Sequence, residues 1–135
     1  NQLKILVVDD EEHIRELLHD LLESERCSVA TAADGYEALA LFESREFDAV
    51  LTDLGMPGMS GWELAGTLRH RSKEIPIAVI TGWGKAVTAN EQQEAGVNWV
   101  IAKPFTADRI FELVREILAH REIEDARRKL STVAA

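Results

Sequence analysis

Acidic side chains end two of the apolar runs in this sequence. The run ILVV leads directly into Asp9 and Asp10, and a second apolar run ends at Asp53. Carboxylates that stand side by side repel one another, and the repulsion grows as they lose water. A cation is therefore expected among them. Carboxylate oxygens suit a hard cation such as Mg²⁺, which takes oxygen ligands and keeps several waters.

A hydroxyl and an ammonium group follow two later apolar runs. Thr81 ends the run IAVIT, and Lys103 comes directly after the run WVIA. An aspartate beside a metal ion and a lysine indicates phosphoryl chemistry, because both cations neutralise charge on the transferring oxygens. An aspartate can itself be the nucleophile, which would give an aspartyl phosphate.

The elements that must position these residues alternate between buried strands and amphipathic helices. Short apolar runs predict strands at 4–8, 28–32, 48–52, 77–81 and 99–102. Helical spacing and capping residues predict helices at 13–24, after the cap Asp34, at 62–70, at 87–96 and after the cap Thr106. The apolar stripe of the first helix includes Leu17, and that of the last helix includes Leu118.

This alternation predicts an α/β fold with a five-stranded parallel sheet and helices on both faces. Strands that read as nearly continuous apolar runs are typical of sheets covered on both sides. Right-handed crossovers leave few topologies, and we expect the flavodoxin-like strand order 2-1-3-4-5. In such folds the functional crevice lies at the carboxyl ends of the strands. Our five candidate residues should therefore converge on one edge of the sheet.

Composition and charge narrow the classes of partner. The 135 residues suit one domain, and their formal net charge of -9 argues against binding nucleic acid or an anionic membrane. The single cysteine, Cys27, cannot form an intramolecular disulfide and fits the reducing cytoplasm. No run predicts a membrane span or a signal peptide. The four histidines lie scattered on predicted helices, where we expect surface positions and no zinc site.

Four segments together resemble the receiver domain of response regulators in bacterial two-component signalling. The segments VVDDEE, LTDLGMPGMSG, VITGWG and VIAKPF occur in this order, each at the expected end of an element. The resemblance covers residues 3–120, so we expect a receiver domain over 1–120. Residues 121–135 are expected to extend the last helix or to form a linker to a partner or to another domain.

The resemblance implies phosphorelay roles for the candidate residues. Asp53 would be the phosphoacceptor, taking a phosphoryl group from a histidine kinase or a histidine phosphotransfer protein. Lys103 would pair with the phosphoryl oxygens, and Thr81 would donate its hydroxyl to them and shift inward on activation. Pro104 would follow a cis peptide bond.

The same resemblance implies a magnesium site. Asp10 would bind Mg²⁺ directly and Asp9 mainly through water. Asp53 and the backbone carbonyl of Gly55 would complete the protein ligands.

Two regions depart from the pattern of the family. The family often has Tyr or Phe three positions before the lysine, where this chain has Val100, with Trp99 one position earlier. Neighbours on a strand face opposite sides, so Trp99 does not replace that aromatic residue. At the mouth of the site, Gly55, Gly82 and Trp83 are expected to modulate how fast water reaches an aspartyl phosphate.

The leading interpretation is a signalling phosphoacceptor that catalyses only its own phosphorylation and slow autodephosphorylation. Its switch would reshape a surface around the fourth helix, the fifth strand and the last helix. A phosphatase of the haloacid dehalogenase type needs a second acid two residues after the nucleophile, where this chain has Gly55. The alternative that stays open is a protein-binding scaffold on the same fold that works without phosphorylation. The sequence leaves the oligomeric state open.

Overall fold

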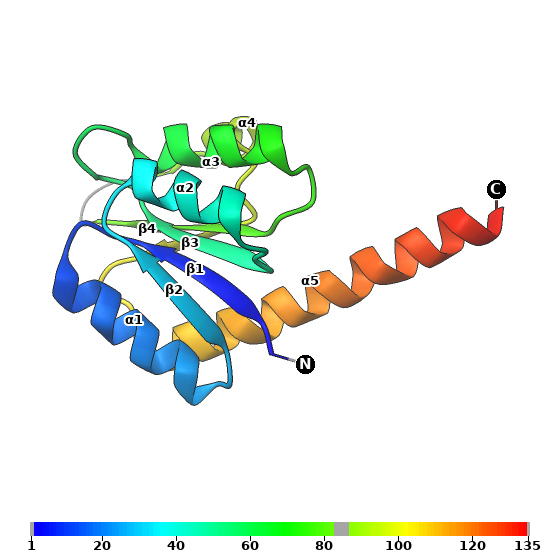
Figure 1. Ribbon diagram of the computed structural model, residues 1–135, viewed down its shortest axis with the longest axis horizontal. Coiled ribbons are helices and arrows are strands. Elements are labelled where there is room, and N and C mark those ends of the chain that lie inside the picture. Colours follow the sequence, from blue (N-terminus) through cyan, green and yellow to red (C-terminus); the bar gives the residue numbers. More distant parts are fainter. Residues whose placement is uncertain (1, 83–86, 135) are drawn as a thin grey trace.

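The apolar runs predicted as strands form one parallel sheet (Figure 1). The computed structural model describes residues 2–82 and 87–134. Its strands are β1 (Lys4–Val8), β2 (Ser28–Ala32), β3 (Ala49–Asp53), β4 (Ile77–Thr81) and β5 (Trp99–Ala102). The order β2-β1-β3-β4-β5 confirms the predicted topology. β3 begins and ends one residue later than predicted, so Asp53 is its last residue.

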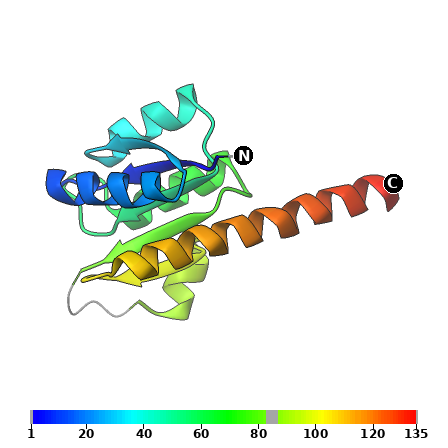
Figure 2. The same ribbon diagram turned by 90° about the horizontal axis from the view of Figure 1, so that it is seen from below.

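Helices cover both faces of the sheet, as predicted. They are α1 (Glu12–Ser24), α2 (Gly35–Ser44), α3 (Gly61–Arg71), α4 (Ala89–Ala95) and α5 (Ala107–Ala134). α1 and α5 lie next to each other on one face, and α2, α3 and α4 cover the other (Figures 1 and 2). No helix among the described residues combines the length and the apolar character needed to cross a bilayer.

The strands contribute apolar side chains to two separate cores because successive residues point to opposite faces. Ile5 and Val7 of β1 pack with α1 and α5, whereas Leu6 and Val8 pack with α2 and α3. All four side chains are almost completely buried. Burial on both faces explains why this strand reads as an unbroken apolar run that ends only where Asp9 begins.

Side-chain caps set where α2, α4 and α5 begin. Asp34 accepts a hydrogen bond from the backbone N–H of Glu37, and Thr106 accepts one from the N–H of Arg109, as the predicted caps require. α4 begins later than predicted, because Thr88 and Glu91 form a reciprocal capping box that starts the helix at Ala89. Its predicted end is confirmed by Gly96, whose φ of 70° is left-handed.

α5 continues as one helix to Ala134, past the edge of the sheet at which the strands begin (Figure 1). Its inner side chains Ile110, Leu113, Val114 and Ile117 are buried, but Leu118 is 39% exposed. Leu118 is therefore not part of the core, contrary to the stripe read from the sequence. The division of the chain at residue 120 stays a prediction.

Candidate functional site

The five candidate residues lie at the carboxyl edge of the sheet. Asp9 and Asp10 follow β1, Asp53 ends β3, Thr81 ends β4 and Lys103 follows β5. One carboxylate oxygen from each aspartate lies within 4.8 Å of the others. The Lys103 Nζ lies 3.4 Å from Asp53 Oδ1 and 3.5 Å from Asp9 Oδ2. The predicted convergence of three acids and an ammonium on one edge is thus present.

Backbone hydrogen bonds beyond the strands hold these positions in register. The N–H of Asp9 donates to Ala32 O at 3.1 Å, and the N–H of Lys103 donates to Thr81 O at 2.8 Å. The pairing therefore continues past the last residues of β1 and β5. It fixes the backbone from which Lys103 reaches toward the aspartates.

Asp9 is fully buried, and its two carboxylate oxygens differ. Oδ1 accepts a hydrogen bond from the N–H of Glu11 at 2.9 Å. Oδ2 accepts no hydrogen bond among the described residues, although the Lys103 ammonium faces it. Burial raises the pKa of Asp9, and the charge of Asp53 adds to that rise, while the Glu11 N–H opposes it. Additional positive charge beside this carboxylate would favour its ionised form.

Asp53 and Lys103 form a partly desolvated ion pair. Burial raises the pKa of Asp53, and the charge and hydrogen bond of Lys103 offset part of that rise. Burial alone would lower the pKa of Lys103, but the attraction of Asp9 and then Asp53 outweighs it, so this pKa lies above its ordinary value. The ammonium stays charged at neutral pH and is shared between two carboxylates.

The donor set fits a hard divalent cation. Three carboxylates converge on one point, one of their oxygens is buried without a hydrogen bond, and one ammonium cannot balance three negative charges. The donors are all oxygens, which is the set that Mg²⁺ takes in preference to zinc or copper. Asp10 is exposed, so the cluster is open to solvent on its side.

Two residues that support this edge were missed from the sequence. The Arg15 guanidinium donates to the backbone carbonyl of Asp9 at 2.7 Å, which braces the chain where it leaves β1. Gly61 packs so tightly under β3 that a Cβ there would lie 2.3 Å from Asp53 O. Neither signal is visible in the sequence, because each depends on contacts between separate elements.

The predicted modulating positions differ in their surroundings. A Cβ added to Gly55 or Gly82 would meet nothing within 4 Å, so both glycines leave open space. The Lys103–Pro104 peptide bond is cis, as predicted. Trp83 lies outside the described residues.

Val100 and Trp99 face opposite sides of the sheet, as the strand alternation predicts. Val100 packs against the core on the side of α2 and α3, and Trp99 against the core on the side of α1 and α5. The Trp99 ring makes an edge-to-face contact with His120 of α5, at 5.8 Å between centroids. His120 is thus partly buried instead of lying on the surface as expected.

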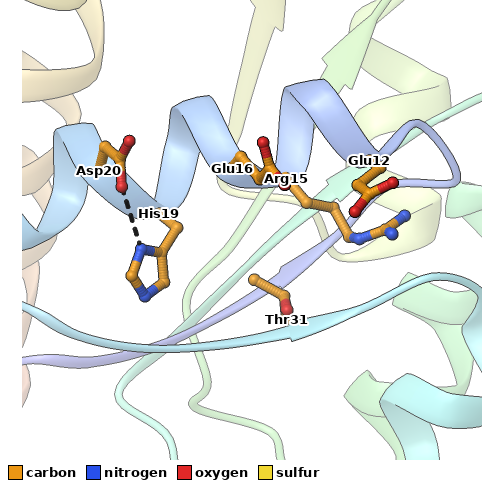
Figure 3. A pocket seen from close by; sticks show the side chains of 6 residues that line it. All are labelled: Glu12, Arg15, Glu16, His19, Asp20 and Thr31. Atoms are coloured by element: carbon orange, nitrogen blue, oxygen red, sulfur yellow. Dashed lines mark hydrogen bonds and ion pairs between the residues drawn. The ribbon is translucent and has the colours of Figure 1, made fainter.

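A charged hollow lies between α1 and β2, beside the cluster of three aspartates and not over it (Figure 3). It is lined by Glu12, Arg15, Glu16, His19, Asp20 and Thr31. His19 Nδ1 lies 3.3 Å from Asp20 Oδ1 and 3.5 Å from Glu23 Oε1, and all three side chains are at least one-third exposed. The hollow contains no lysine and no buried carboxylate, so it lacks the charge arrangement of the sheet edge.

Comparison with known proteins agrees with the geometry. The sequence profile of the response regulator receiver domain matches residues 5–115. The chemotaxis protein CheY of Pseudomonas aeruginosa is 37% identical over 118 residues, which cover 85% of this chain and 95% of that protein. The response regulator TrrA of Thermotoga maritima, solved in complex with Mg²⁺ and BeF, has a TM-score of 0.79 and 36% identity, covering 86% of this chain and 99% of that one. NtrX of Brucella abortus has a TM-score of 0.86 and 32% identity, covering 98% of this chain and 30% of that one.

Proposed function

Because this chain belongs to the response regulator receiver domain family, whose members are signalling phosphoacceptors, we propose that Asp53 accepts the phosphoryl group. The observation that carries the proposal is the position of Lys103, whose ammonium lies between Asp53 and Asp9 at the carboxyl edge of the sheet. A fixed cation at this point can balance charge that develops on a transferring phosphoryl group.

Asp53 is better placed than Asp9 to act as the nucleophile. The Asp9 Oδ1 already accepts a hydrogen bond from Glu11, and its side chain is 1% exposed, against 9% for Asp53. In the proposed step a carboxylate oxygen of Asp53 attacks phosphorus, the phosphorus–nitrogen bond of a phosphohistidine donor breaks, and the imidazole leaves with its electron pair. The product is an acyl phosphate on Asp53.

Lys103 and Thr81 would hold the transferred group. The Lys103 ammonium would pair with a phosphoryl oxygen, and its raised pKa keeps it protonated for this role. The Thr81 hydroxyl would donate to another oxygen, and its buried position at the end of β4 supports an inward-facing role. The hydrogen bond from Lys103 N–H to Thr81 O holds the two residues side by side.

Asp9, Asp10 and Asp53 would hold Mg²⁺, with the backbone carbonyl of Gly55 as a further ligand. The buried Oδ2 of Asp9, which accepts no hydrogen bond from the described residues, supports this assignment. When bound, the ion would supply the positive charge that the three carboxylates lack and would neutralise phosphoryl oxygens.

The phosphoryl donor would be a histidine kinase or a histidine phosphotransfer protein, and phosphorylation would relay the signal by a conformational switch. Val100 stands where relatives often have an aromatic residue, so the output surface around α4, β5 and α5 would respond to Thr81 without an aromatic switch.

The space beside Gly55 and Gly82, together with Trp83, would set how fast water reaches the acyl phosphate, and Pro104 would position Lys103.

The decisive experiment is intact-mass spectrometry after incubation with acetyl phosphate, with and without Mg²⁺. We expect one phosphoryl adduct on the wild type that requires Mg²⁺ and is absent from Asp53→Asn. Asp20→Asn, which removes an exposed carboxylate of α1, is the matched control and should keep the adduct.

A folded wild type that forms neither an adduct nor a complex with beryllofluoride would overturn the proposal. That outcome would favour a binding scaffold that works without phosphorylation. An adduct that persists in Asp53→Asn would instead show that another residue is the acceptor.

A further inference from the structure

The part of α5 beyond Leu118 carries apolar residues on a new face of the helix. The apolar side chains of α5 that are buried in the domain core end at Ile117. Further on, Ile123 is 52% exposed and Leu130 is 70% exposed, on the part of α5 that projects past the sheet (Figure 1). Exposed apolar residues are informative when they share one face, because such a face can be an interaction site.

These residues follow a heptad pattern. Ala119, Ile123, Ala126 and Leu130 are spaced by four, three and four residues, and all four are exposed. This is the alternating a and d spacing of a coiled coil, with Ile123 and Leu130 at a and the alanines at d. We call these four residues the seam.

Ion pairs to the domain turn the seam away from it. Arg121 Nη1 lies 3.6 Å from Asp48 Oδ1, and Arg128 Nη1 lies 3.5 Å from Glu74 Oε2. With Ile123 at a, both arginines occupy f positions, on the side of the helix opposite the seam. The seam therefore faces away from the domain, where a second helix can pack against it.

We propose that the seam pairs with that of a second copy of this chain in a parallel two-stranded coiled coil. The flanking charges favour this occupant. Glu122 lies at g and Arg127 at e of the next heptad, and in a parallel pair these two positions face each other across the interface. The twofold axis of a dimer makes this contact twice.

Arg127 can change partners at little cost. Within the chain it lies 3.2 Å from Glu124, but its side chain is 72% exposed, and exposed pairs contribute little to stability. The seam is short and its d positions are alanines, so we expect dimerisation to depend on protein concentration.

Sedimentation equilibrium of the 135-residue chain over a range of concentrations tests the proposal. We expect a monomer–dimer equilibrium in the wild type, with a dissociation constant that rises at least about tenfold in Ile123→Asp and in Leu130→Asp. Leu118→Asp is the control, because Leu118 is exposed on the same helix but lies off the seam. Circular dichroism would confirm that each variant is folded.

Two outcomes of this experiment would overturn the proposal. One is a wild type that stays monomeric up to its solubility limit. The other is a dimer that Leu118→Asp weakens as much as the seam variants do, since the interface would then lie on another face of α5.

A charge exchange tests the parallel arrangement. Glu122→Arg and Arg127→Glu should each weaken the dimer, because they place like charges across the interface, and the double variant should restore wild-type affinity. Failure of the double variant to restore it would contradict the proposed pairing.

Disulfide formation adds a geometric measurement. Ile123→Cys should crosslink through the two a positions under mild oxidation. The native Cys27 should not interfere, because it is buried and burial raises the pKa of its thiol to about 11. A dimer in which the two introduced thiols do not crosslink would not be parallel and in register.

Discussion

Among the described residues, two clusters of side chains each bring three potential metal ligands within 4.8 Å of one another. The edge cluster comprises Asp9, Asp10 and Asp53, and the helix cluster comprises His19, Asp20 and Glu23 of α1. They differ in burial, because two of the three residues of the edge cluster are buried and none of the helix cluster is. The edge cluster also has an ammonium group held against two of its carboxylates.

The comparison shows that proximity alone does not make a site. Exposed carboxylates are solvated, and their mutual repulsion is weakened by water and salt. Water screens the repulsion between buried carboxylates much less. Desolvation and this repulsion together raise the pKa values of Asp9 and Asp53. A cation bound nearby would relieve both effects.

Lys103→Met should have the largest effect on stability. It leaves two buried carboxylates without their ammonium, so we expect the free energy of unfolding at neutral pH without metal to fall by about 2 kcal/mol. His19→Asn, in the exposed cluster, should change it by less than about 0.5 kcal/mol. Urea unfolding measures both. A Lys103→Met protein as stable as the wild type would show that the ammonium does not compensate the buried charge.

Magnesium binding should separate the two clusters. Asp9→Asn and Asp10→Asn should each weaken Mg²⁺ affinity by at least about tenfold, which corresponds to about 1.4 kcal/mol. Asp20→Asn and Glu23→Gln should leave the affinity unchanged. Isothermal titration calorimetry gives the affinities. If the α1 variants weakened binding as strongly, the ion would be held by the helix cluster.

Asp53→Asn should stabilise the metal-free protein. The substitution removes a buried carboxylate whose ionised form is disfavoured by desolvation, so we expect a higher free energy of unfolding at neutral pH. Asp20→Asn is again the matched control and should give no gain. A loss of stability in Asp53→Asn would mean that its ion pair with Lys103 outweighs the desolvation of its carboxylate.

The stabilisation by Asp53→Asn should depend on pH. The pKa of Asp53 in the folded state lies above its ordinary value of 3.8. Between 3.8 and the folded pKa, the folded protein therefore binds more protons at this carboxyl group than the unfolded protein does. The contribution of this carboxyl group to stability therefore falls as pH rises through the folded pKa. The gain from Asp53→Asn should shrink as pH is lowered toward 3.8, and a gain independent of pH would argue against charge as its cause.

The sheet and its charged edge could be predicted from the sequence because their signals are local. Each apolar run marks a strand, and the run in β1 stops where Asp9 begins. Parallel topology then brings the ends of the strands together without further information. The contact of Arg15 with Asp9 could not be foreseen, because it joins a helix to a strand end through space.

The outer parts of the helices were harder to predict, because spacing alone does not tell which neighbour a side chain meets. Leu17 and Leu118 fit the apolar stripes of α1 and α5 but are exposed. His120 was expected on the surface, yet it packs against Trp99 of β5. The C-terminal part of α5 includes the ion pairs Glu124–Arg127 and Asp125–Arg128, both at a spacing of three residues.

The two glycines that flank the loop after β3 set different limits on mutational tolerance. A side chain at Gly61 would run into the backbone of Asp53, so substitution there would displace the strand end that carries the acceptor. A side chain at Gly55 would extend into empty space two residues after the same aspartate. Substitutions at position 55 can therefore change the entrance of the site without displacing β3. At position 61 only glycine fits without a shift of the backbone that carries Asp53.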